Sequence, residues 1–252
     1  MIMPIKAPVN YHPKKKPSAQ RKNRQSSKPF KQVFQFKIAL KDVEPLIWRR
    51  IQVPDCYTFW DLHCAITDAF GWLDYHLHQF TINNPEGCNE EHIGIPNKDR
   101  FEDDAKVLPG WTKKIAHYFS TEHPESDYTY DFGDDWQHSV VLESILPPEA
   151  DTTYPRCIAG ENACPPEDCG GVMGYQDFRK TIADPQVEEH EELLAWVGGW
   201  FDPAWFDPSL IRFADPALRF DMAFNHKPVP KSVRQVQFHH MRQKRVKTGK
   251  WA

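Results

Sequence analysis

The sequence predicts an α+β domain in which a mainly antiparallel sheet packs with helices. Three observations support this class: several segments alternate apolar and polar residues, others place apolar residues at helical spacing, and the two kinds do not alternate regularly. Of the 252 residues, 40% are hydrophobic and 13% are aromatic, which is enough to fill one core. We expect a single domain over residues 33–225, with disordered basic tails at 1–32 and 226–252.

The first two predicted strands form a hairpin. Residues 34–40 alternate apolar and more polar side chains, which is the pattern of a half-buried strand. A turn at Pro45 separates this segment from residues 46–53, which are rich in β-forming side chains. Because the connection is short, we expect the two strands to pair in antiparallel fashion.

A helix is predicted over residues 59–70. Thr58 can cap its first turn, and Asp61 adds a negative charge there. Apolar residues recur along one face at spacings of three and four, and Gly71 is a suitable end for the helix.

The rest of the domain contains strands and two further helices, separated by a region with little pattern. We predict strands over residues 77–82, 128–132 and 137–146, and helices over 175–183 and 187–197. Residues 84–126 are poorly patterned, and there we predict only one short element around Ile115, Tyr118 and Phe119.

Charge is distributed unevenly along the chain. Residues 1–32 carry nine Lys or Arg and no acid, and residues 226–252 carry eight and no acid. The remaining residues hold 14 basic and all 35 acidic side chains, a formal charge of −21. Such tails suit DNA or RNA, although they could instead fold back onto the acidic domain. The residues predicted to contact nucleic acid are Lys14, Lys15, Lys16, Arg21, Lys22, Arg24, Arg242, Lys244, Arg245 and Lys247.

Three cysteines in a loop rich in Gly and Pro form a candidate zinc site. Cys157, Cys164 and Cys169 have the spacing C-x6-C-x4-C, and zinc favours thiolate ligands in a tetrahedral set of four. His138, at the start of a predicted strand, is the candidate fourth ligand. We therefore expect a structural zinc ion, and the alternative is three buried thiols, or a contact between two cysteines, in a loop held by prolines.

A second constellation combines histidines and aspartates. His76 and His78 lie two residues apart on a predicted strand, so we expect both imidazoles on the same side. With His138 and either Asp131 or Asp134, they would form a metal centre with an open position, as a metal-dependent enzyme requires. The simpler alternative is that the histidines are hydrogen-bonded at the sheet edge and the aspartates shape a turn.

Several classes of protein find no support in the sequence. It contains no Walker loop, no G-x-S-x-G elbow and no Rossmann fingerprint. No apolar run is long enough to span a membrane, and the N-terminal region has no apolar signal-peptide core. We therefore expect a cytoplasmic protein that does not enter a membrane.

Four sequence blocks follow one another along the predicted domain. They are L-I-W-R-R at 46–50, H-L-H at 76–78, Y-D-F-G-D-D-W at 130–136 and C-P-P-E-D-C-G-G at 164–171. In this order they resemble the plasmid pRiA4b ORF-3-like family. The resemblance implies an α+β fold and an association with plasmids or insertion elements. It attaches no established reaction, so it transfers no catalytic residue.

These patterns support three hypotheses about function. The first is a non-catalytic binding or adaptor protein of plasmids or mobile elements, with a structural zinc site. The second is a metal-dependent enzyme centred on the histidine and aspartate constellation. The third is an accessory protein that binds nucleic acid through its tails. Depending on the function, the partners of this protein would be another protein, or DNA or RNA bound through the tails.

Removal of both tails is predicted to abolish nucleic-acid binding. For the full chain on random duplex DNA, log K should fall by roughly 0.9 per phosphate contacted for each tenfold rise in salt. Residues 33–225 alone should bind neither duplex DNA nor single-stranded RNA in fluorescence anisotropy titrations. Undiminished binding by the shortened chain would place the site on the domain, near Arg49 and Arg50.

Overall fold

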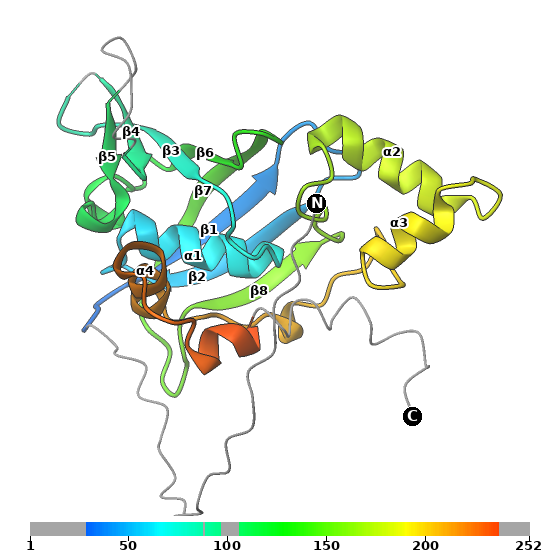
Figure 1. Cartoon of the computed structure of the whole chain (residues 1–252). Helices are drawn as coiled ribbons and strands as arrows, with labels where there is room; N and C mark the ends of the chain where they lie inside the picture. The colour runs from blue at the N-terminus through cyan, green and yellow to red at the C-terminus, as the bar shows by residue number, and fades with distance from the viewer. Residues whose placement is uncertain (1–28, 88, 97–105, 237–252) are drawn as a thin grey trace, which may run out of the picture.

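An eight-stranded sheet forms the body of the protein and confirms the predicted α+β class (Figure 1). The structure is a computed structural model, and it describes residues 29–87, 89–96 and 106–236. Most of the predicted N-terminal tail and the last part of the predicted C-terminal tail lie outside the described residues, and with them all ten basic residues assigned to nucleic acid.

The sheet is antiparallel except at one edge. Its strand order is β5-β4-β3-β6-β7-β1-β2-β8, and only β4 and β5 run parallel. The strands are β1 (Val33–Leu40), β2 (Trp48–Pro54), β3 (His78–Asn83), β4 (Glu90–Gly94), β5 (Val107–Pro109), β6 (Glu125–Tyr130), β7 (Trp136–Leu146) and β8 (Arg156–Glu161). The helices are α1 (Phe59–Phe70), α2 (Gly171–Ala183), α3 (His190–Trp196) and α4 (Pro216–Asn225), with short 3-10 turns η1 (Gly110–Thr112), η2 (Ile115–His117) and η3 (Pro208–Leu210).

The predicted hairpin lies within the sheet. β1 pairs with β2 on one side and with β7 on the other, so Phe36 stands opposite both Ile51 and Leu142. Along β1 the apolar residues are buried and those between them are half-buried, as a period of two requires. The buried side chains of these strands form the floor on which α1 packs.

Helix α1 lies across one face of the sheet (Figure 1). Thr58 and Asp61 form the predicted capping interaction: Thr58 Oγ1 accepts from the Asp61 amide at 3.2 Å, and Asp61 Oδ2 accepts from the Thr58 amide at 2.9 Å. Gly71 ends the helix with a φ of 87°. The sequence predicted a single apolar face, yet every residue except Asp61 is buried, because α4 and η1 also pack against α1.

Three strands were not predicted. β8 lies in the cysteine loop and pairs with β2, with Cys157 opposite Ile51. β4 and β5 lie in the region that showed little pattern. Short strands at sheet edges carry many charged residues, which hides the alternation that identifies a strand.

The segment after residue 210 adds a helix that was also not predicted. Asp215 caps α4 by accepting from the Ala217 amide at 2.9 Å, and Pro216 occupies the first turn. Residues 231–236 are helical, and Val233 is only 1% exposed. The beginning of the basic C-terminal segment therefore packs against the domain.

Arg49 joins β2 to the end of α1 and to the chain after β8. It is 1% exposed, and burial lowers its pKa to about 10. Its donors reach four backbone carbonyls, those of Ala69 at 3.0 Å and of Trp48, Glu161 and Asn162 at 2.8 Å each. A cation in this place also complements the negative end of the α1 dipole.

Replacement of Arg49 should destabilise the protein strongly. Arg49→Met leaves buried carbonyl groups unpaired and should lower the free energy of unfolding by about 3–5 kcal/mol in urea titrations. Arg50→Met is the matched control, because Arg50 bonds to Glu143 at 2.5 Å near the surface and should contribute under about 1 kcal/mol. Equal losses in the two variants would contradict the structural role of Arg49.

Candidate functional site

One cluster in the structure has the composition of a metal site. Ligand atoms of His76, Asp131 and Asp168 all lie within 4.8 Å of one another, and no other set of three or more His, Cys, Asp or Glu atoms does so in the part of the chain that the structure describes. The His76 Nδ1–Asp131 Oδ1 distance is 3.5 Å, and the His76 Nε2–Asp168 Oδ1 distance is 3.1 Å. We call these three residues the His/Asp cluster.

Three separate loops supply the cluster. His76 precedes β3, Asp131 follows β6, and Asp168 lies in the loop before α2. Both aspartates have a positive φ, 57° for Asp131 and 56° for Asp168, which is a backbone conformation that Asp and Asn tolerate better than most residues. The Asp131 carboxylate also accepts from the Gly133 amide at 2.9 Å, which fixes its orientation in the turn.

A contact between two turns brings Asp168 to the other two ligands. The Gly170 amide donates to Asp134 Oδ2 at 3.1 Å, so the loop before α2 lies on the turn after β6. Gly171 has a φ of 67°, and a Cβ at this position would clash with the carbonyl oxygen of Asp134. The glycines of this loop therefore permit the close approach of the two backbones.

The nitrogen His76 Nε2 is left without a satisfactory partner. Although it lies 3.1 Å from Asp168 Oδ1, this nitrogen atom is buried and makes no hydrogen bond. Glu167 lies 3.7 Å from the same nitrogen, and burial raises the pKa of its carboxyl. A cation would satisfy this nitrogen and the carboxylates at once.

The apolar rim of the cluster is exposed. Tyr75, Leu77 and Phe132 are next to the cluster residues in sequence and are 66%, 52% and 53% exposed. The Asp131 amide donates to the Leu77 carbonyl at 2.9 Å, which holds two parts of the rim together. Exposed large apolar side chains grouped around polar residues are typical of a binding site.

The structure separates residues that the sequence grouped into one histidine and aspartate centre. His78 is 2% exposed and stacks on His63 with a centroid distance of 3.4 Å, away from the cluster. Asp134 accepts from the Gly170 amide and shapes the turn. Only His76 and Asp131 of the predicted set lie together. Glu167 and Asp168 were missed, although their position between two cysteines in a tight loop was a signal.

The predicted zinc ligands do not form a group in the described residues. Cys157 is on β8, and burial raises the pKa of its thiol to about 11. Cys164 lines the aromatic pocket described in the next paragraph, and Cys169 lies in the loop before α2. His138 is fully buried on β7, where its Nδ1 donates to the Tyr128 carbonyl at 3.2 Å. Zinc on these four residues stays a prediction, because no three of their ligand atoms lie within 4.8 Å of one another in the described residues.

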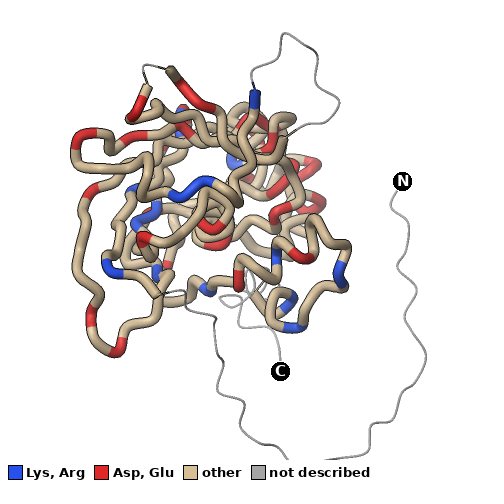
Figure 2. Tube along the Cα trace, turned by 90° about the vertical axis from the view of Figure 1, so that its left-hand side faces the viewer, with Lys and Arg blue, Asp and Glu red and all other residues tan. Residues whose placement is uncertain are grey.

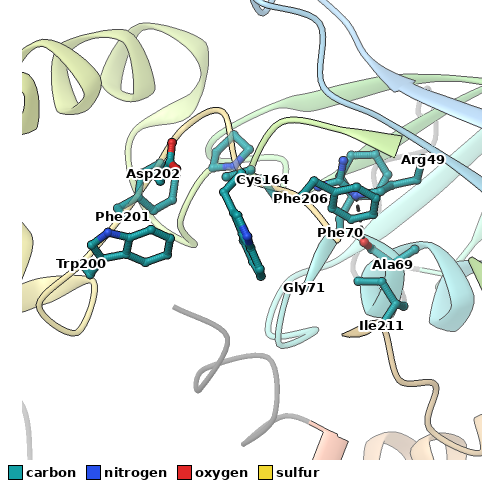
Figure 3. A pocket seen from close by; sticks show the side chains of 13 residues that line it. Arg49, Ala69, Phe70, Gly71, Cys164, Trp200, Phe201, Asp202, Phe206 and Ile211 are labelled. Atoms are coloured by element: carbon teal, nitrogen blue, oxygen red, sulfur yellow. Dashed lines mark hydrogen bonds between the residues drawn. The ribbon is translucent and has the colours of Figure 1, made fainter. Parts of the chain in front are cut away.

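Cys164 helps to line a separate pocket whose walls are mainly aromatic (Figure 3). Its volume is about 70 Å³, and its walls include Trp200, Trp205 and Phe201. The Arg49 guanidinium lies between the rings of Phe70 at 5.1 Å and Phe206 at 3.8 Å. Because Arg49 uses four hydrogen bonds on backbone carbonyls, its main role is structural.

Residues 33–225 hold 35 acidic and 14 basic side chains. Both kinds are spread along the described part of the chain (Figure 2). No helix in the described ranges has the length and apolar character that crossing a bilayer requires.

The fold and the His/Asp cluster together define an α+β domain with a candidate metal-binding turn region. The chain belongs to the plasmid pRiA4b ORF-3-like protein family, whose sequence model matches residues 32–210. It is 33% identical over 166 residues to the uncharacterized protein y4hQ of Sinorhizobium fredii, covering 66% of this chain and 81% of that protein. It also resembles the crystal structure of the protein of unknown function MM3350 from Methanosarcina mazei Go1. There the identity is 43% and the TM-score 0.68, covering 73% of this chain and 100% of that chain.

Because His138 is buried, we predict that the free energy of unfolding falls at acidic pH. Burial lowers the pKa of His138 to about 3, below its ordinary value of 6.5. As the pH falls below 6.5, the unfolded chain binds a proton that folded His138 does not. The free energy of unfolding should therefore decrease by about 1.4 kcal/mol per pH unit for this residue, until the pH nears its folded pKa.

His138→Gln should make this pH dependence shallower. Glutamine keeps a donor for the Tyr128 carbonyl but does not titrate. Urea unfolding between about pH 5 and pH 7 measures the slope. His117→Gln, on the exposed η2 turn, is the control for loss of an exposed imidazole. A slope unchanged by His138→Gln would mean that His138 has the same pKa in the folded protein as in the unfolded chain, and it would contradict the lowered pKa.

Proposed function

We propose that this protein is a metal-dependent binding protein that holds one divalent cation at His76, Asp131 and Asp168. The observation that carries the proposal is the convergence of three ligand atoms within 4.8 Å, with His76 Nε2 buried and lacking a hydrogen bond. Three protein ligands leave coordination positions open, through which the ion can bind a further molecule.

The ligand set favours a cation of intermediate hardness. Two carboxylates and one imidazole suit Zn²⁺, Mn²⁺ or Fe²⁺, whereas Mg²⁺ prefers oxygen ligands and keeps several waters. The acidic groups around the site also attract cations, and they disfavour an anion when no metal is bound. Zinc thus stays the first cofactor to test, at a different site from the one that the cysteine spacing predicts.

A binding role is supported more directly than a catalytic one. Tyr75, Leu77 and Phe132 flank the cluster residues in sequence, and their exposed side chains offer apolar surface to a ligand or partner of a bound ion. This agrees with a non-catalytic binding or adaptor protein. The family name ties such a role to plasmids, and the basic tails add a candidate route to DNA or RNA.

Metal-dependent hydrolysis is a second candidate, and one observation favours it. Glu167 lies 3.7 Å from His76 Nε2, and its raised pKa suits a general acid or base near a metal-bound water. Its carboxylate also accepts from the Leu73 amide at 2.7 Å, so it has a structural role as well. Turnover of an activated ester by metal-loaded protein, lost in Glu167→Gln, would favour the enzyme.

Removal of either aspartate charge should weaken metal binding. The full chain should bind about one Zn²⁺ or Mn²⁺ in native mass spectrometry and calorimetry, and Asp131→Asn and Asp168→Asn should each weaken the affinity on the order of 10- to 100-fold. Both substitutions keep the side-chain shape, and Asn tolerates the positive φ of these positions.

Asp151→Asn is the matched control. Asp151 also has a positive φ, 56°, and lies on an exposed turn before β8. Its substitution should leave the affinity unchanged. Metal retained by both cluster variants and lost on replacing Cys157, Cys164 and Cys169 by serine would refute the proposed site and support the zinc site predicted from the cysteine spacing.

A further inference from the structure

A second site is hidden beneath α4. Arg219 is the only buried residue of α4, and its side chain inserts toward α1. Arginine is rarely buried completely unless it is paired. The helix around it is otherwise half-buried or exposed, so α4 docks mainly through one charged side chain and its aromatic neighbours.

The Arg219 guanidinium is held from several directions. Nη1 donates to Asp68 Oδ1 and to the Cys64 carbonyl, each at 3.1 Å, and Nη2 donates to Thr67 Oγ1 at 3.0 Å. Nη2 also forms an ion pair with Asp74. Two carboxylates, a hydroxyl and a carbonyl therefore surround the planar cation, which matches the geometry that a guanidinium recognises.

The two carboxylates that surround Arg219 differ in their other contacts. Asp74 Oδ1 lies 2.8 Å from His63 Nε2, and His63 Nδ1 lies 2.8 Å from the Tyr128 hydroxyl. Burial disfavours ionisation of Asp74, but Arg219 and His63 outweigh this effect and lower its pKa. Asp68 lies farther from the cation, and burial raises its pKa to about 6 despite Arg219. Asp74 is thus the stronger anion of the pair.

Aromatic side chains extend the contact along α4. Phe220 packs on Trp60 and Trp111 with centroid distances of 5.9 and 5.5 Å, and Phe224 packs on the same two rings at 5.3 and 4.7 Å. The Trp60 indole also donates to the Pro216 carbonyl at 3.0 Å. α4 therefore contacts α1 and η1 through Arg219 and through two phenylalanines that lie one turn apart on the helix.

The pocket and its occupant belong to different parts of the chain. The family match covers residues 32–210, which includes Asp68, Asp74 and both tryptophans, whereas α4 begins at Pro216. A buried ion pair adds little stability relative to an apolar contact of similar size, so its presence here is better explained by recognition. Figure 1 shows α4 beside α1, at the edge of the family domain.

We propose that Thr67, Asp68 and Asp74 form a guanidinium-binding pocket of the family domain, and that Arg219 fills it in cis. The ligand class is an amphipathic helix that carries an arginine followed by phenylalanines one and five residues later, as α4 does. The pocket with Trp60 and Trp111 is then a docking site for such a helix. In this chain, α4 occupies that site and competes with any partner helix.

Chemical rescue tests the pocket in the full-length protein. Arg219→Ala should lower the melting temperature on the order of 10 °C, because two buried carboxylates lose their cation. Methylguanidinium should restore several degrees to this variant, whereas methylammonium at the same concentration should not. Arg212→Ala is the control, because Arg212 is exposed and should show neither the loss nor the rescue. Equal effects of the two cations on Arg219→Ala would overturn the proposal.

A peptide measurement tests the docking site even if Arg219→Ala does not fold. Full-length Arg219→Lys keeps a charge but lacks the planar donor fork, so its α4 should be easier to displace. A labelled peptide spanning residues 213–227 should bind this variant at least tenfold more tightly than the same peptide carrying Arg219→Ala. Similar affinities of the two peptides, or binding of neither, would contradict a guanidinium-dependent site.

Discussion

The contact between two tight turns is the interaction on which the candidate metal site depends. The turn after β6 and the loop before α2 meet where the Gly170 amide donates to Asp134 and where Gly171 leaves no room for a side chain. This contact holds Asp168 beside His76 and Asp131, although the two aspartates are far apart in sequence. It forces like charges together, and a cation is the simplest way to compensate them.

Charged groups inside this protein are held in two different ways. Arg49 has its hydrogen bonds to backbone carbonyls and fastens α1 to β2 and the chain after β8. Arg219 instead meets two carboxylates. The first arrangement needs only the backbone of the fold and is structural. The second uses ionisable side chains that an arginine from elsewhere could also satisfy, which is why it points to recognition.

Local sequence signals predicted the parts of the fold that depend on near neighbours. The cap formed by Thr58 and Asp61 spans three residues, and the alternation along β1 comes from one face of one sheet. The sequence predicted that the imidazoles of His76 and His78 lie on the same side of one strand. β3 begins only at His78, so His76 lies in the preceding loop and the two side chains do not follow the strand alternation. Periodicity does not extend past the end of a strand.

Features made by distant contacts could not be predicted in this way. Asp168 joins the cluster only because two loops touch. The flanking cysteines marked its loop as a candidate, but they did not indicate which other loop it would meet. From its sequence neighbours, Arg219 would be expected at the surface, as most arginines are. It is buried only because α4 packs against α1. The cysteine spacing, in contrast, gave a clear expectation of zinc, while the described sulfur atoms do not converge with His138.

X-ray absorption at the zinc edge of the metal-loaded full chain tests the central claim most directly, because it reports which atoms touch the ion. Zinc at the His/Asp cluster predicts a first shell of nitrogen and oxygen at about 2.0–2.2 Å with no sulfur. A shell dominated by sulfur at about 2.3 Å would contradict the account and place the ion on the cysteines.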